Sequence, residues 1–179
     1  MAMSMQKVLL LMLFLTGLIL SSVGSASAQN STETYSWKQA VKKTVTDPTT
    51  YFPTGLSYDS SIRDWKTSQP LFELGFVELN PRYTISGQPN DKPLSYEAGQ
   101  KRIVYDSITV ITFSSLHNFS SRLIENKLKE SYPNHKKFIS ALTWTERIAF
   151  AIAVSYKMSA AHYRQAQLNR QILANLHQN

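Results

Sequence analysis

Residues 146–176, ERIAFAIAVSYKMSAAHYRQAQLNRQILANL, decide the fold of this 179-residue chain. The stretch contains neither proline nor glycine, so nothing in it interrupts a helix. At about 1.5 Å per residue, a helix of this length spans roughly 45 Å. Its first half is apolar nearly all round and its second half is polar. This pattern predicts that the first half is the buried central helix of the domain.

The rest of the C-terminal half is also expected to be helical. In residues 94–179, Gly99 is the only glycine and Pro133 is the only proline. Ser95 is suited to cap a helix over 96–116, and a second amphipathic pattern predicts a helix over 119–130.

Two further patterns precede the long helix. Asn134 is suited to cap a short helix that ends at Leu142. The sequence TWTE, residues 143–146, is typical of a capping box, in which the Thr143 hydroxyl accepts from an early amide and Glu146 reaches back. The long helix is therefore expected to begin at this box.

The segment before this helical core is rich in turns. Trp37 and the apolar residues that follow it predict a short helix over 37–45. Residues 48–58, PTTYFPTGLSY, are expected to be irregular because they contain two prolines and a glycine. Asp59 or Ser60 is suited to cap a second short helix.

Residues 66–94 contain four prolines and two glycines, too many for a long regular element. Only 70–76 has a helical pattern. Six apolar side chains are spaced along the segment as a whole, so we expect a long loop that packs over the core.

Together these patterns predict a single all-α domain over 36–178, a small helical bundle with one long central helix and a turn-rich N-terminal segment packed over it. Within it, short helices and the long packed loop occupy 36–94, and the helical core occupies 95–179.

The N-terminus is typical of a secretory signal peptide, residues 1–28. Lys7 gives a positive start, 8–20 form an apolar run of 13 residues, and small residues precede a cleavage site after Ala28. The run is shorter than the ~20 residues of a membrane-spanning helix. The sequence therefore predicts an exported protein, periplasmic or secreted, whose mature chain begins with a polar, disordered start over 29–35. It has no cysteine, so its stability depends on an ordinary core.

Charge is unevenly distributed along the chain. Residues 29–99 have a net charge of −1, whereas 100–179 have a net charge of +7. On the long helix Lys157, Arg164 and Arg170 have no acidic residue nearby, which makes them candidates for contact with an anionic surface such as lipid headgroups or an envelope polymer. No nucleic-acid recognition module is present in the sequence.

A polar stripe on the long helix is the best candidate site. Its members follow steps of four, three and seven residues and so share one face: Ser155, Ser159, His162 and Asn169. Asp106 and His117 lie eleven residues apart, about three turns, on the preceding helix. If the two faces met, Asp106, His117 and His162 would form a seam able to transfer a proton or hold a metal.

No motif in the sequence specifies a catalytic reaction, and we expect no cofactor and no metal site. The sequence therefore favours a non-enzymatic exported helical protein that acts by contact with a cell-envelope component, which is an envelope protein, a lipid or an anionic polymer. Three alternatives stay open. They are a helical carrier of a small molecule or lipid, a hydrolase or metal enzyme that uses the Asp/His seam, and a membrane-associated helical protein.

Overall fold

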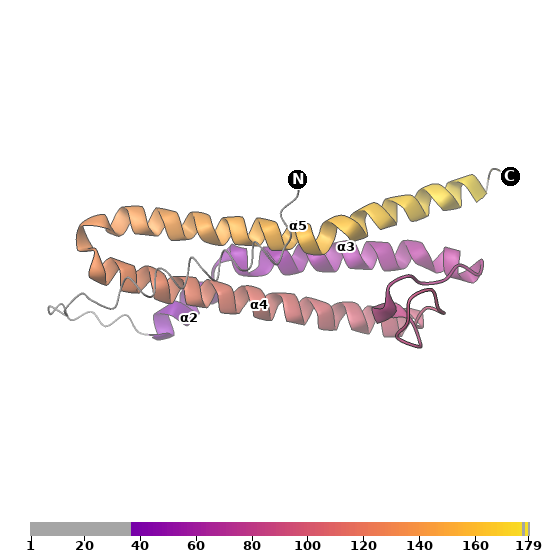
Figure 1. Cartoon of the computed structure of the whole chain (residues 1–179), viewed down its shortest axis with the longest axis horizontal. Helices are drawn as coiled ribbons and strands as arrows, with labels where there is room; N and C mark the ends of the chain where they lie inside the picture. The colour runs from indigo at the N-terminus through magenta and orange to yellow at the C-terminus, as the bar shows by residue number, and fades with distance from the viewer. Residues whose placement is uncertain (1–36, 177, 179) are drawn as a thin grey trace.

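The computed structural model describes residues 37–176 and 178 (Figure 1). This part of the chain forms four α-helices and no strand: α2 (Trp37–Val45), α3 (Pro48–Glu73), α4 (Tyr96–Ser131) and α5 (Lys136–Leu176). Helices α3, α4 and α5 lie side by side, with α4 antiparallel to the other two, and α2 packs against α4 (Figure 1). The all-α prediction, with one long C-terminal helix packed against the others, is confirmed. The predicted signal peptide, 1–28, and the polar start, 29–35, lie outside the described residues.

Helix α3 is continuous through the segment that the sequence predicts to be irregular. Residues 48–58 form its first half, and no separate helix begins at Asp59 or Ser60. The short helix predicted over 70–76 is the last part of α3, which ends at Glu73. These predictions are wrong because they rest on local proline and glycine signals, which tertiary packing overrides here.

The start and the packing of α3 explain why it tolerates its prolines. The Asp47 carboxylate accepts hydrogen bonds from the backbone N–H of Thr49 at 3.0 Å and from its hydroxyl at 2.7 Å, and Pro48 follows in the first turn, where its missing N–H has no partner to lose. Pro53 lacks a backbone N–H and so removes one backbone hydrogen bond inside the helix. Small side chains on the buried face let α4 and α5 approach closely: Thr50, Ser57, Ser60, Ser61 and Ser68.

Helix α4 is also continuous, where two helices over 96–116 and 119–130 are predicted. Ser95 caps it as predicted, accepting a hydrogen bond from the backbone N–H of Ala98 at 3.3 Å. Because neither glycine nor proline lies between the two predicted helices, nothing ends the first one, and Asn118 continues it as a buried helical residue.

Helix α5 begins before the predicted capping box and passes through it. A turn with a short 3-10 helix, η3 (Pro133–His135), joins α4 to α5. The Thr143 hydroxyl donates back to the carbonyl of Ile139 at 2.9 Å, an interaction of a residue inside a helix. Glu146 contacts α4 instead of reaching back to Thr143. The predicted separation of a short helix over 134–142 from the long helix is therefore wrong.

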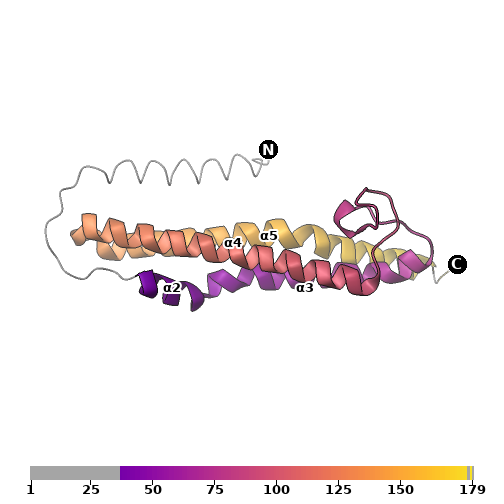
Figure 2. The same cartoon turned by 90° about the horizontal axis from the view of Figure 1, so that it is seen from below.

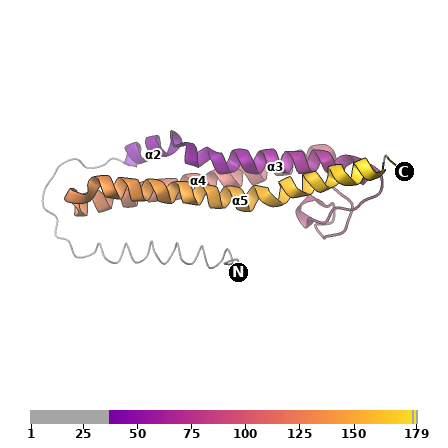
Figure 3. The same cartoon turned by 90° about the horizontal axis from the view of Figure 1, so that it is seen from above.

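Residues 74–95 connect α3 to α4, and we call this segment the strap. It contains a 3-10 helix, η2 (Pro81–Tyr83), and two isolated antiparallel bridges, Glu78 to Asp91 and Thr84 to Pro93. The strap crosses to the side of the bundle opposite α3 (Figures 2 and 3). It packs on the core through buried Tyr83 and Thr84, but most of the apolar side chains expected to anchor it are exposed: Phe76, Val77, Leu79 and Ile85. The loop also begins eight residues later than predicted.

An aromatic cluster holds the strap end of the bundle. Trp65 of α3 packs against Tyr83 of the strap, with ring centroids 5.5 Å apart, and against buried Ile103 of α4. The indole N–H of Trp65 donates to the carbonyl of Tyr96 at 3.0 Å. Gly99 is required here because a Cβ at this position would overlap the Trp65 ring. This cluster is where the strap, α3 and α4 meet.

The rest of the bundle interior is mostly polar. Among the described residues, 18 buried positions are polar or charged and 10 are hydrophobic. Large apolar side chains are instead common on the outside of all the helices. Small polar residues at helix interfaces let backbones approach closely, so the helices pack through their backbones and short side chains.

Candidate functional site

A small polar cavity lies between α3, α5 and the strap. Its volume is about 40 Å³, which is room for roughly three water molecules. Its walls come from eight residues: Ser61, Asp64, Trp65, Ser68, Glu78, Asn80, Tyr83 and His162. This volume is too small to enclose an organic substrate.

An Asp–His pair forms one wall of this cavity. Asp64 Oδ2 lies 2.7 Å from Nδ1 of His162. Asn169, two turns further along α5, donates to Ser68 at 2.8 Å and to the other Asp64 oxygen at 3.4 Å. The carboxylate holds the imidazole in one orientation and leaves Nε2 for water or a ligand. The pair joins α3 to α5.

Glu78 of the strap also lines this cavity. Burial raises the pKa of its carboxyl, and the nearby Asp64 charge raises it further, while the backbone N–H of Asn80 opposes the shift by donating to the carboxylate. That hydrogen bond is 2.7 Å long. Ionisation of Glu78 is therefore less favourable in the folded protein than in water.

The structure brings together part of the predicted polar stripe. His162 and Asn169 lie on the same side of α5 and contact the same residue, Asp64. Ser155 and Ser159 share this buried face, but each hydroxyl donates to the carbonyl four residues earlier, at 2.6 Å. These two serines contribute small size at the helix interface and no free polar group.

The predicted seam of Asp106, His117 and His162 does not form. Asp106 pairs with Arg82 and accepts from the Tyr83 hydroxyl, and burial beside Asp106 raises the pKa of that phenol. His117 Nε2 lies 2.7 Å from a Glu146 oxygen. Since Glu146 precedes His162 by sixteen residues on α5, the two histidines are about 24 Å apart along the bundle.

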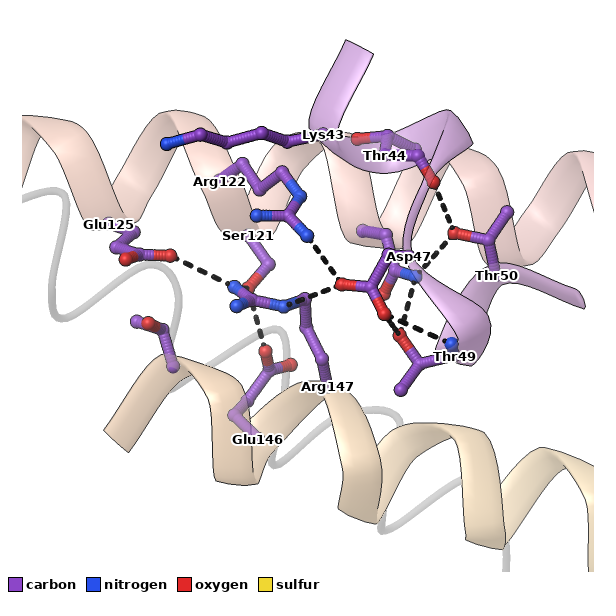
Figure 4. A network of polar contacts seen from close by, with 12 residues as sticks. Lys43, Thr44, Asp47, Thr49, Thr50, Ser121, Arg122, Glu125, Glu146 and Arg147 are labelled. Atoms are coloured by element: carbon purple, nitrogen blue, oxygen red, sulfur yellow. Dashed lines mark hydrogen bonds and ion pairs between the residues drawn. The ribbon is translucent and has the colours of Figure 1, made fainter. Parts of the chain in front are cut away.

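Sequence reasoning missed a buried ionic network, which joins all four helices (Figure 4). Asp47, between α2 and α3, pairs with Arg122 of α4, and Arg147 of α5 lies 3.5 Å from the same carboxylate. Arg147 is only 4% exposed, and it also contacts Glu125 at 3.1 Å. The one sequence signal was that Arg147 directly precedes the apolar run 148–154, where an arginine that becomes buried requires acidic partners.

The two glutamates of this network are held ionised by their neighbours. Burial alone would raise the pKa of Glu125, but the hydrogen bonds and charges of Lys129 and Arg147 outweigh it, so the pKa lies below its usual range. Glu146 follows the same pattern, with burial outweighed by His117, Ser121 and Arg147. The network is therefore charged in the folded protein, and its ion pairs link the helices.

A second, open groove of about 560 Å³ lies between the strap and the start of α4. Three cationic residues line it: Arg82, Lys101 and Arg102. Both arginines pair with Asp106. The groove is shallow and its arginines are already paired, so it does not form an enclosed carrier pocket.

The predicted anionic-surface residues are all exposed on α5. Lys157, Arg164 and Arg170 make no ion pair with any residue that the structure describes.

Within the same part of the chain, no group of three or more histidines and carboxylates is placed to hold a metal ion.

One segment of the described chain, Pro133–Leu176, is long and apolar enough to cross a membrane by length and composition alone. A third of its most apolar window is buried, and the core helix of a soluble bundle passes the same test.

Comparisons with models of protein families, with curated proteins and with solved structures found no match to this chain.

Proposed function

We propose that the mature chain is a non-enzymatic exported protein that acts by contact with the anionic surface of a membrane. The contact is made by the end of the bundle at which α4 turns into α5. We call residues 132–138, YPNHKKF, the basic tip. The observation that supports this function is that all seven consecutive residues of the tip are exposed.

The basic tip combines the two side-chain types that favour a membrane interface. Tyr132 and Phe138 stand at its two ends, and Phe138 is 68% exposed. Trp144, just beyond the tip on α5, is 57% exposed. Aromatic side chains favour the headgroup region of a bilayer. Lys136 and Lys137 lie between them, and each lysine near an anionic surface contributes about 1 kcal/mol.

Other features of the chain agree with this site. The sequence predicts export, which places the mature chain on the outer side of the cytoplasmic membrane. Lys157 follows Lys137 by twenty residues, about 30 Å along α5, so it lies outside the contact of an upright bundle. Its charge, with those of Arg164 and Arg170, adds long-range attraction instead.

The enzyme and carrier alternatives have less support. The Asp64–His162 pair faces a cavity of about 40 Å³, which has no room for an organic substrate. The larger groove beside the strap is open, whereas carrier pockets bury most of their ligand.

The test is co-sedimentation of the purified mature chain, residues 29–179, with vesicles. One vesicle type contains 30% phosphatidylglycerol in phosphatidylcholine and the other phosphatidylcholine alone. We expect binding to the anionic vesicles, weakened by salt. The Lys136→Glu/Lys137→Glu variant should bind at least about 30-fold more weakly, since about 2 kcal/mol of attraction is lost.

The matched control is Lys157→Glu/Arg164→Glu, which changes the net charge equally on exposed residues away from the tip. We expect this variant to lose less than about five-fold, because it alters only long-range attraction. Equal losses in the two variants would show that the tip is not the contact. Binding to a soluble polyanion such as polyphosphate, with no binding to anionic vesicles, would assign the tip to an envelope polymer instead of a lipid.

A further inference from the structure

Helix α4 carries two faces with the same heptad-like spacing. The inner face consists of its buried positions, which are mostly small or polar: Gly99, Ile103, Ser107, Val110, Ser114, Asn118, Ser121 and Glu125. The outer face lies on the opposite side of the helix, at steps of three, four, four, three and four residues, and we call it the outer stripe: Tyr105, Ile108, Thr112, Leu116, Phe119 and Leu123. The spacing of the outer stripe is that of a seam that receives another helix.

The outer stripe is mostly apolar and mostly exposed, with polar Thr112 near its middle and Phe119 half-buried. Tyr105 is 65% exposed and Leu116 is 61% exposed, and Ile108 and Leu123 are also exposed. Six such side chains present roughly 500 Å² of contiguous surface, at the upper end of what soluble monomers expose. Two copies of the stripe would bury on the order of 1,000 Å², which meets the lower bound for a specific interface.

The charge distribution favours a second copy of the chain as the partner. The C-terminal half has a net charge of +7, so two copies repel each other over most of its surface. Between Asp106 and Arg122, however, α4 carries no Asp, Glu, Lys or Arg. The four central residues of the stripe therefore lie on a part of the surface at which two copies can meet with little repulsion between like charges.

We propose that the outer stripe is the interface of an antiparallel homodimer. In this arrangement Tyr105 faces Leu123 of the second copy, Ile108 faces Phe119, and Thr112 faces Leu116. Each pair joins a larger side chain to a smaller one, which fills the seam evenly. A parallel pairing would place two Thr112 residues together and two Phe119 residues together, leaving a gap in one place and crowding in another. The dimer is independent of lipid binding by the basic tip.

The first measurement is the mass of the mature chain in solution by light scattering. We expect twice the mass of one chain for the wild type, and the mass of one chain for Ile108→Lys/Leu116→Lys. The matched control is Ile152→Lys, an exposed apolar residue of α5 outside the stripe, which should remain a dimer. Circular dichroism checks that each variant keeps its helices. A monomeric wild type, or a dimer that survives the double substitution, overturns the proposal.

Cross-linking tests the direction of the two helices. The chain contains no cysteine, so introduced thiols are unambiguous. In the antiparallel dimer, Tyr105→Cys mixed with Leu123→Cys should cross-link through a short bismaleimide, whereas Tyr105→Cys alone should not. In that arrangement two copies of residue 105 lie about 27 Å apart along the seam. Cross-linking of Tyr105→Cys alone would show a parallel pairing and contradict the proposal.

Discussion

The two ends of the bundle are held together by different interactions. Near the turn between α4 and α5, buried Arg147 links Asp47 to Glu125 across three segments of chain. At the strap end, Trp65 packs between Tyr83 and Ile103. Apolar packing tolerates small shifts, whereas a buried charge requires its partners in place. We therefore expect the charged end to fix the alignment of the helices and the aromatic end to supply more of the stability.

The largest loss of stability is expected at the aromatic end. Trp65→Ala should lower the free energy of unfolding by about 4 kcal/mol, because it empties the space that Gly99 leaves for the ring. Urea denaturation measures this change. Trp144→Ala, an exposed control, should change it by less than about 0.5 kcal/mol. Similar losses in the two variants would show that the cluster at Trp65 does not hold the strap end.

The charged end should be almost as sensitive to the loss of one partner. Arg147→Met removes a buried cation and leaves Asp47 and Glu125 with fewer partners, at an expected cost of about 3 kcal/mol. The same substitution at exposed Arg164 is the control and should cost less than about 0.5 kcal/mol. If Arg147→Met were as stable as the control, the network would contribute nothing to the folded state.

The helical class and several boundaries of the fold were predictable from the sequence, because they depend on local signals. The short helix over 37–45 and the Ser95 cap are confirmed. The first half of α3 was not predictable, since Pro53 and Gly55 indicate a break. The helix persists there because α4 and α5 pack against its serines, which is a tertiary effect.

The candidate site was half predictable, because only the part that depends on local helix spacing could be derived from the sequence. The spacing of His162 and Asn169 places them on one face of α5, and the structure joins them through Asp64. Asp64 was missed because its helix was not predicted at full length. If α3 had been predicted as one continuous helix, Asp64 would have been recognised as part of a polar stripe like that on α5. This stripe follows steps of four and three residues: Ser57, Ser61, Asp64 and Ser68.

The pH dependence of stability should differ in sign between the two ends, with smaller effects than those above. The neighbours of Glu125 lower its pKa in the folded state. Its stabilisation is therefore complete above the ordinary value of 4.5 and is lost as the pH falls through the lower folded value. At pH 7, Glu125→Gln should cost about 1 kcal/mol. This cost should shrink towards zero in acid, where the wild-type carboxyl is also neutral.

Glu78 at the strap end should behave in the opposite way. Burial raises its pKa, so the fold binds this proton more tightly than the unfolded chain does. Its contribution is complete below 4.5 and declines as the pH rises through the folded value. Glu78→Gln keeps an oxygen that accepts from Asn80 and should raise stability at pH 7 by about 0.5 kcal/mol. Urea titrations from pH 3 to pH 8 measure both variants. If the two differences from wild type changed with pH in the same direction, the two ends would share one electrostatic character and the contrast between them would be wrong.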